Sequence, residues 1–175
     1  TRECIVGSER VFREPFSECG TCRICQEVCP TGALWGDYEF TATRCISSLT
    51  QQRRPLSLEE AEWINTALYG CELCQKACPR NTMACESKKL SAGRPCQIHQ
   101  FELLDMNKRA FQDKYRHYGF AWRGLKTLQR NAIVNIYNSG SVKLVDQLRR
   151  WRTEKPAPDY LIPVMDMMEK TAKFR

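Results

Sequence analysis

The sequence of 175 residues has no long apolar run, and none approaches the roughly eighteen residues that a helix needs to cross a bilayer. Its first residues carry charges at once and lack the apolar stretch of a secretion signal. Alternation of apolar and polar residues, which marks a half-buried strand, never lasts more than a few positions. We therefore expect a mainly helical protein without a membrane partner, with one or two short strands at most, for example around residues 38–41.

Cysteine, by contrast, is abundant. The sequence has 11 cysteines, and eight of them lie between Cys19 and Cys78. Thiols two residues apart on a turn are poor disulfide partners but converge well on a metal site, which favours thiolate ligands in a reducing compartment. We predict a cytoplasmic protein on this ground. Cys4, Cys85 and Cys96 fall outside the pattern, and we interpret them as spare thiols rather than as a third metal site.

The first cysteine motif runs Cys19-x2-Cys22-x2-Cys25-x3-Cys29 and is followed directly by proline. Bacterial ferredoxins with two 4Fe-4S clusters use this spacing, in which three close thiolates bind one cluster and the fourth reaches across to the other. Thiolates suit such clusters because they are soft, anionic ligands. The motif therefore predicts two clusters that share the ligands of one loop.

A second motif, Cys71-x2-Cys74-x3-Cys78, also precedes a proline. Aligned on that proline, it matches the last three cysteines of the first motif. The position of the missing first ligand holds Leu68, which cannot bind iron. The isolated Cys45 is the natural replacement, because it lies between the two motifs and brings the number of ligands to eight.

Eight ligands divide evenly between two clusters. We predict one set of Cys19, Cys22, Cys25 and Cys78 and a second set of Cys29, Cys45, Cys71 and Cys74. Two zinc sites or a set of disulfides are the alternatives, but ferredoxin-type triplets with a trailing Cys-Pro are not typical of zinc proteins.

We expect a lead-in segment over residues 1–18 and a ferredoxin-like module over residues 19–98.

Helical signals occupy most of the remaining sequence. Ser57 begins a capping box, and apolar residues then recur at helical spacing until Gly70. Beyond residue 100 the sequence predicts four helices: one capped by Asp105, one that carries Trp122, one capped by Ser141 and one from Asp159 to Phe174. Several aromatic residues of this part are predicted to pack in the core rather than to stack on the bases of a nucleic acid: Phe111, Tyr115, Tyr118 and Trp122. Short capped helices joined by tight turns indicate a HEAT-like stack of helical hairpins over residues 99–175.

Charge is unevenly divided along the chain. Of the 27 basic and 20 acidic residues, residues 1–79 carry 8 and 11, a balance of −3, which leaves 19 and 9 for residues 80–175, a balance of +10. The basic half favours a polyanionic partner. Arg123, Lys126 and Arg130 are spaced along one predicted helix and are our candidates for contacts with RNA phosphates. A solvated helix face is the plainer alternative.

Several segments resemble one known family. They are CISSLT at 45–50, GCELCQ at 70–75, RGL at 123–125, LQRNA at 128–132 and NSG at 138–140. Together with the order of the eight cysteines, they make the sequence similar to epoxyqueuosine reductase from about residue 16 to its end.

The resemblance implies a function and further partners. Members of this family reduce epoxyqueuosine to queuosine in tRNA with cobalamin and two 4Fe-4S clusters, and a HEAT-like helical domain helps to hold the anticodon stem-loop. The resemblance places a loop with Ser47 and Ser48 toward the corrin; turn residues that hydrogen-bond their own backbone are the plainer alternative for the two serines. Electrons would come from a donor such as a flavodoxin or a ferredoxin. The family's cobalamin-binding domain, with its acidic proton donor, cannot fit into residues 1–15. We therefore assign no catalytic residue, and we expect activity to need that domain or a separate subunit.

Other interpretations remain beside this one. The main alternative is a stand-alone two-cluster electron carrier whose helical tail binds a protein partner. The cluster domain of a reductive dehalogenase-like protein has a similar cysteine order, but the long basic, helical stretch after Cys78 argues against it. The sequence begins with Thr1 rather than Met, which is compatible with a piece of a longer chain.

Overall fold

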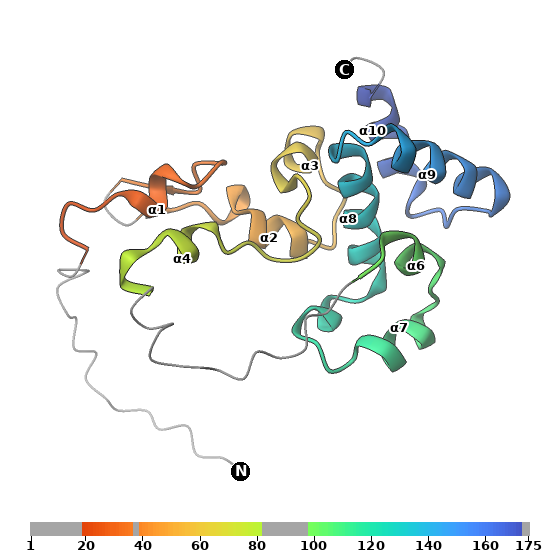
Figure 1. Ribbon diagram of the computed structural model, residues 1–175, viewed down its shortest axis with the longest axis horizontal. Helices are drawn as coiled ribbons and strands as arrows, with labels where there is room; N and C mark the ends of the chain where they lie inside the picture. Colours follow the sequence, from red (N-terminus) through yellow and green to blue (C-terminus); the bar gives the residue numbers. More distant parts are fainter. Residues whose placement is uncertain (1–18, 37–38, 82–97, 173–175) are drawn as a thin grey trace, which may run out of the picture.

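The computed structural model describes residues 19–36, 39–81 and 98–172. The predicted lead-in over residues 1–18 and the three spare cysteines, Cys4, Cys85 and Cys96, lie outside the described residues. Helices dominate the described part, which confirms the mainly helical prediction. Figure 1 shows α1 and α4 at one end of the molecule, with the later helices grouped around α8 at the other.

Short helices make up both parts of the described chain. Those of the cysteine-rich part, with its two strands, are α1 (Ile24–Glu27), β1 (Leu34–Trp35), β2 (Glu39–Phe40), the 3-10 helix η1 (Ala42–Arg44), α2 (Ile46–Gln51), α3 (Leu58–Ile64) and α4 (Leu73–Ala77). Those of the later part are α6 (Gln100–Asp105), α7 (Lys108–Tyr115), the 3-10 helix η2 (Gly119–Arg123), α8 (Leu125–Asn138), α9 (Val142–Glu154) and α10 (Ile162–Ala172). Among these described helices, none has the length and apolar character needed to cross a membrane.

A small hairpin follows the first cysteine motif. Strands β1 and β2 pair antiparallel, with Leu34 opposite Phe40 and Trp35 opposite Glu39. Gly36 follows β1 with a φ of 55°, a left-handed conformation that favours glycine. The short strand that the sequence predicts in this region is thus confirmed as β2.

Helix α8 forms the core of the molecule. Every residue from Thr127 to Tyr137 is buried, because α8 packs against α6, α9 and α10 and also against α2 and α3 of the cysteine-rich part. A helix enclosed in this way is usually apolar all round, yet α8 buries Gln129, Arg130 and Asn131. The apolar side chains of both parts belong to one continuous cluster. Polar residues of α8 therefore need partners inside that core.

Helix α3 confirms the predicted capping box. Ser57 Oγ accepts a hydrogen bond from Glu60 N at 3.2 Å, while Glu60 Oε2 accepts one from Ser57 N at 2.9 Å. The helix ends at Ile64, earlier than the predicted end at Gly70. Asn65 turns the chain there with a φ of 47°, which helical geometry does not allow.

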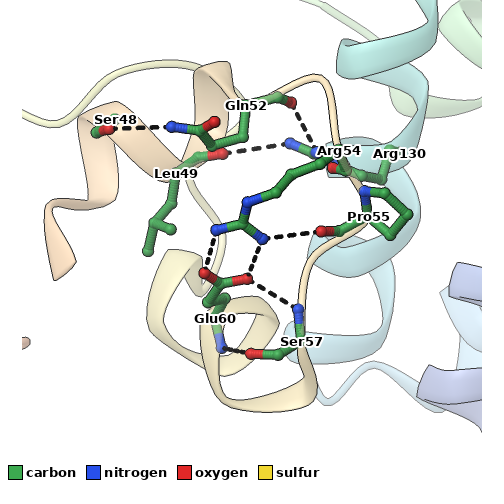
Figure 2. A network of polar contacts seen from close by, with 8 residues as sticks. All are labelled: Ser48, Leu49, Gln52, Arg54, Pro55, Ser57, Glu60 and Arg130. Carbon is green, nitrogen blue, oxygen red and sulfur yellow. Dashed lines mark hydrogen bonds and ion pairs between the residues drawn. The ribbon is translucent and has the colours of Figure 1, made fainter. Parts of the chain in front are cut away.

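The capping carboxylate also pairs with a guanidinium, which leads to a testable pH effect. Arg54 donates to the two carboxylate oxygens of Glu60 at 2.5 and 2.7 Å (Figure 2), and these bonds lower the pKa of Glu60 from 4.5 to about 2. Because the folded carboxyl loses its proton more easily than the unfolded one, the pair stabilises the fold fully above pH 4.5 and loses its effect as the pH falls toward 2. The half-exposed Arg54 limits the gain, so we expect Glu60→Gln to cost about 1 kcal/mol at pH 7.

Thermal unfolding followed by circular dichroism measures this effect. The difference in melting temperature between Glu60→Gln and the unsubstituted protein should shrink as the pH is lowered from 5 to 3. Glu59→Gln on the same helix is the matched control and should change little at any pH. A difference that stays constant over this pH range would contradict the pairing.

One predicted helix cap is wrong. Asp105 ends α6 instead of capping the next helix, and its carboxylate accepts hydrogen bonds from Trp151 Nε1 and Lys155 Nζ, both at 2.7 Å. Asn107 caps α7, because its Oδ1 accepts from Ala110 N at 2.9 Å. Asp105 therefore fastens α6 to α9 and the residue after it.

Helix α8 begins later than its apolar pattern predicts. Gly124 has a φ of 84°, so helical geometry starts only at Leu125. Ser141 caps α9 as predicted and accepts a hydrogen bond from Leu144 N at 3.4 Å. Caps formed by hydroxyl groups are thus recognised correctly from the sequence in both halves of the chain.

The aromatic residues of the later part are not all in the core. Phe111 and Tyr115 are buried, as predicted. Tyr118 is partly exposed, and Trp122 is 58% exposed, which corrects the prediction for both. Trp122 Nε1 donates a hydrogen bond to Tyr69 Oη at 2.9 Å, so its indole lies against the cysteine-rich part rather than inside the helical one.

Candidate metal centre

The two cysteine motifs lie side by side because α1 packs against α4 (Figure 1). Cys25 is part of α1, and Cys74 is part of α4. Cys78 is the residue at which α4 ends. The two short helices thus bring thiols that are far apart in the sequence to the same end of the molecule.

Tight turns present other cysteines of the two motifs. Cys22 N donates a hydrogen bond to Cys19 O at 2.9 Å, and Gly20 inside this turn has a φ of 50°. Gly70 has a φ of 74° directly before Cys71. Residues with a side chain rarely adopt a positive φ, so each glycine permits a turn beside a ligand at little cost.

Cys29 has surroundings that favour a thiolate. Burial alone would raise the pKa of its thiol, but hydrogen bonds from Thr31 and Ala33 outweigh burial and lower the pKa below its usual 9.0. Ala33 N lies 3.3 Å from Cys29 Sγ, and donors of this kind stabilise metal-bound sulfur. Arg44 Nε donates to Thr31 O at 2.7 Å, which brings a positive charge to the same loop.

Cys45 lies where η1 ends and α2 begins. Thr50 in the same helix binds the loop of the second motif, since Gly70 N donates to Thr50 Oγ1 at 2.9 Å. The isolated cysteine is therefore connected through one buried side chain to the loop that carries Cys71. This arrangement supports the predicted set that contains both cysteines, which stays a prediction.

The eight cysteines form a donor set suited to iron-sulfur clusters. All eight are free thiols, and all except the exposed Cys22 are half-buried, which tells against the disulfide alternative. In the described part of the chain, no three His, Cys, Asp or Glu side chains come close enough to hold one metal ion. Each of the four irons of a 4Fe-4S cluster takes one cysteine thiolate, so eight cysteines can supply two clusters.

Comparison with a family model identifies the same region. Residues 18–81 match the 4Fe-4S double cluster binding domain. This range contains all eight predicted ligands, and the match confirms two 4Fe-4S clusters as the cofactors of the chain. The division of the ligands between the clusters stays a prediction.

Longer stretches of the chain are similar to known reductases. Epoxyqueuosine reductase of Staphylococcus aureus is 34% identical over 145 residues, which make up 82% of this chain and 38% of that protein. The solved epoxyqueuosine reductase of Streptococcus thermophilus matches with a TM-score of 0.65 and 29% identity, over 83% of this chain and 39% of the other. An epoxyqueuosine reductase solved with an epoxyqueuosine-modified tRNA-Tyr stem loop gives a TM-score of 0.66 and 31% identity, over 84% and 40%. This chain belongs to the epoxyqueuosine reductase family.

The likeness to the epoxyqueuosine reductase family extends beyond the clusters. The 145 aligned residues exceed the cluster domain at 18–81, so the similarity continues into the helices that follow it. The chain spans about two fifths of the length of the curated relatives that it matches. The family inferred from the sequence motifs is thus confirmed, for the part that this chain covers.

The two serines that the epoxyqueuosine reductase resemblance places toward the corrin lie in a helix. Ser47 and Ser48 belong to the first turn of α2, and both are half-buried, so the predicted loop at this position is wrong. Ser48 Oγ accepts a hydrogen bond from Gln52 Nε2 at 3.3 Å (Figure 2), and Ser47 O accepts one from Thr50 Oγ1 at 3.0 Å. Contact of either serine with a corrin stays a prediction.

Arg130 is not available for RNA phosphates, which corrects its predicted role. It is 7% exposed, and burial lowers its pKa to about 10, so it keeps its charge at neutral pH. Its Nη1 donates to Gln52 O at 2.7 Å and Arg54 O at 2.6 Å. Its Nη2 donates to Leu49 O at 3.3 Å (Figure 2). The same Nη2 donates to Asn131 Oδ1 at 2.8 Å, and Nε donates to this asparagine oxygen at 3.1 Å. All five N–H groups are used, so Arg130 joins α8 to the chain that follows α2.

Two asparagines of α8 strengthen this junction. Asn131 Nδ2 donates to Thr50 O at 2.8 Å and to Leu68 O at 2.9 Å. Asn138 Nδ2 donates to Ala61 O at 2.8 Å in α3. Neither role is predicted from the sequence, although two asparagines seven residues apart fall on one face of a helix and are unusual on an otherwise apolar face.

Arg123 and Lys126 remain candidates for RNA contacts. The Arg123 guanidinium lies 3.6 Å from the centre of the Trp122 ring, and the Lys126 ammonium lies 4.7 Å from the centre of the Tyr160 ring. Neither cation forms an ion pair with a carboxylate of the described residues. Both charges are therefore open to an outside anion, and their role in binding RNA stays a prediction.

Replacing Thr50 tests the connection between α2 and the second motif. Thr50→Val keeps the shape of the side chain but removes the acceptor of the Gly70 N–H, so we expect a loss of about 1 kcal/mol in stability. Because the loop before Cys71 is then less firmly held, the reduction potential of one cluster should change while iron content stays the same. Redox titration followed by EPR measures the potential, and the exposed Thr66→Val is the control. Unchanged potentials in Thr50→Val would contradict the connection.

Proposed function

We propose that this chain is the electron-transfer and tRNA-docking part of an epoxyqueuosine reductase, which delivers electrons to cobalamin for the reduction of epoxyqueuosine to queuosine in tRNA. The observation that carries the proposal is the junction at α8. Arg130 and Asn131 bind the basic helical half to the main chain that precedes the ligands of the second motif. Such a junction keeps a polyanion-binding surface and an electron-transfer centre in one fixed relation.

The cysteine residues hold the cofactors in this proposal. Each thiolate binds one iron, and the clusters supply one-electron transfer when bound. The N–H of Ala33 stabilises negative charge on Cys29, and Arg44 holds the same loop through its bond to Thr31 O. Cys22 is the exposed member of the set, so we place the approach of an electron donor, such as a flavodoxin or a ferredoxin, at its loop.

The remaining parts of the reaction need a second component. Removal of an epoxide oxygen as water takes two electrons and two protons. The electrons pass through this chain, whereas the corrin and the proton donor belong to a cobalamin-binding domain or subunit. The greater length of the curated relatives supports this division, since the chain corresponds to about two fifths of them.

Three observations support tRNA as the docking partner. Residues 80–175 have a charge balance of +10. Arg123 and Lys126 have no carboxylate partner among the described residues, so they can neutralise phosphates. One solved relative in the family binds an epoxyqueuosine-modified stem loop. We assign the corresponding RNA, an anticodon stem-loop, to the basic half of this chain.

Anaerobic reconstitution tests the proposal. The purified chain is loaded with iron and sulfide and mixed with cobalamin and an epoxyqueuosine-containing stem-loop. We expect the stem-loop to bind at low salt and its affinity to fall at least about tenfold between 50 and 200 mM salt. Reduced clusters should also change the visible spectrum of added cobalamin. Tight binding to a redox enzyme without any affinity for the stem-loop would favour the stand-alone carrier instead.

A further inference from the structure

A basic cavity lies at the beginning of α8. Its volume is about 860 Å³, and its walls come from residues 53–56, from α7, from the first turns of α8 and from α10. Leu56, Val164 and Met167 contribute apolar surface to these walls. A volume of this size is typical of sites that enclose a small organic group.

Positive charge dominates the lining of the cavity. No Asp or Glu of the described chain lines it, whereas six cations do: Arg53, Arg54, Lys108, Arg123, Lys126 and Arg130. Glu60 neutralises Arg54, and main-chain carbonyls occupy Arg130. The other four cations form no ion pair with a described carboxylate. The cavity therefore carries several charges that an anionic ligand would neutralise.

The first turn of α8 adds hydrogen-bond donors to the cavity. Gly124 precedes α8 and provides no side-chain cap, and the first residues of the helix, Leu125 to Thr127, line the cavity. The free N–H groups of this first turn add positive potential to that of the side chains. A phosphate oxygen in the cavity can accept hydrogen bonds from these main-chain N–H groups.

The aromatic side of the cavity is fixed in place. Tyr160 Oη donates to Gln129 Oε1 at 2.5 Å, and Gln129 Nε2 donates in turn to Leu103 O at 3.0 Å. Because Gln129 is buried, these bonds hold the Tyr160 ring against α8. The ring thus forms a rigid part of the wall beside Lys126.

We propose that this cavity takes one unpaired nucleotide of a bound RNA loop, with its phosphates held by Lys108, Arg123 and Lys126 and its base against the apolar wall and Tyr160. The inference rests on the tRNA-docking function proposed above and adds a specific site to it. Loops expose bases that a duplex keeps stacked, and proteins read such bases with apolar and aromatic surfaces. An acidic peptide would match the charge but would leave the apolar wall uncovered, so a nucleotide fits both features better.

An abasic scan of the loop tests the site. The full chain, purified anaerobically, is titrated at low salt against a synthetic anticodon stem-loop in which each loop nucleotide in turn lacks its base. We expect one abasic position to weaken binding about tenfold in the unsubstituted protein. The same position should have no effect in Tyr160→Leu, which already lacks the ring. Tyr160→Phe keeps the ring and should retain the full effect of the abasic position.

Charge variants provide a second measurement that does not depend on Tyr160. Lys126→Gln and Lys108→Gln should each weaken binding several-fold and reduce its salt dependence. Arg150→Gln on α9, away from the cavity, is the matched control. It should change the affinity and its salt dependence far less. If Tyr160→Leu fails to fold, the effect of the abasic position on binding is compared between Lys126→Gln and the unsubstituted protein instead.

The possible outcomes separate the site from the function on which it rests. Equal effects of all abasic positions, or an effect that persists in Tyr160→Leu, would overturn the nucleotide site while the stem-loop still binds. Competition by polyglutamate as strong as that by the stem-loop would overturn it as well, since the cavity would then respond to charge alone. If the intact stem-loop does not bind even at low salt, the tRNA-docking function itself fails.

Discussion

Replacement of Arg130 by methionine is expected to lower the free energy of unfolding by about 2–4 kcal/mol. The change removes all five donors of the guanidinium and leaves the carbonyls of Leu49, Gln52 and Arg54 without it. Each buried acceptor that loses its donor costs about 1 kcal/mol or more. We expect the melting temperature to fall by roughly 5–15 °C. Circular dichroism follows the unfolding of the helices, and visible absorbance follows the loss of the clusters, so the melting of the two halves is measured separately.

Two variants show whether the geometry or the charge of Arg130 matters. Arg130→Lys keeps the charge but has only three donors without a planar fork, so it should recover a part of the stability. Arg150→Met removes an exposed arginine of α9 and should change stability by no more than about 0.5 kcal/mol. The helices and the clusters should also melt at different temperatures in Arg130→Met, because the bonds between the two halves are lost. A melting curve like that of Arg150→Met would refute the role of Arg130.

Replacement of Cys45 by alanine is expected to remove one cluster of the two. Cys45 is the isolated ligand between the motifs, and no other cysteine of its predicted set can take its place. Iron should fall from about eight to about four atoms per chain, with a parallel fall in acid-labile sulfide. Elemental analysis of protein purified under anaerobic conditions measures both. Retention of all the iron in Cys45→Ala would remove this cysteine from the site.

Comparison of several cysteine variants tests the exchange of ligands between the motifs. Cys29→Ala and Cys45→Ala should leave the same cluster intact, whereas Cys78→Ala should leave the other one. EPR spectra of the reduced proteins distinguish the two remaining clusters. Cys4→Ala lies outside the predicted sets and should keep about eight irons. If Cys29→Ala and Cys78→Ala give the same spectrum, the predicted division of the ligands is wrong.

Local signals made much of the fold predictable from the sequence. The Cys-x2-Cys-x2-Cys spacing, the capping box at Ser57 and the cap at Ser141 each depend on residues within a few positions of one another. Such contacts form wherever the chain begins a helix or surrounds a metal site, so the sequence alone indicates them. The matched double-cluster domain and the described caps confirm these predictions.

The errors concern partners that are distant in the sequence. Asp105 is a good capping residue, but Trp151 and Lys155 bind it after the chain has folded, and Asn107 caps the helix instead. The spacing of Arg130 with Lys126 suggested an exposed basic stripe. The main chain from Leu49 to Arg54, nearly eighty positions earlier, buries it. No local pattern reports a contact over such a separation.

The burial of α8 affects any attempt to transplant the cluster module. A fragment that stopped before α6 would leave the apolar faces of α2 and α3 in water and would deprive several carbonyls of their donors. Such a fragment would aggregate sooner than it would accept iron. A protein engineer who grafts these clusters onto another enzyme has to include α8, because its Arg130, Asn131 and Asn138 bind the main chain of the cluster module.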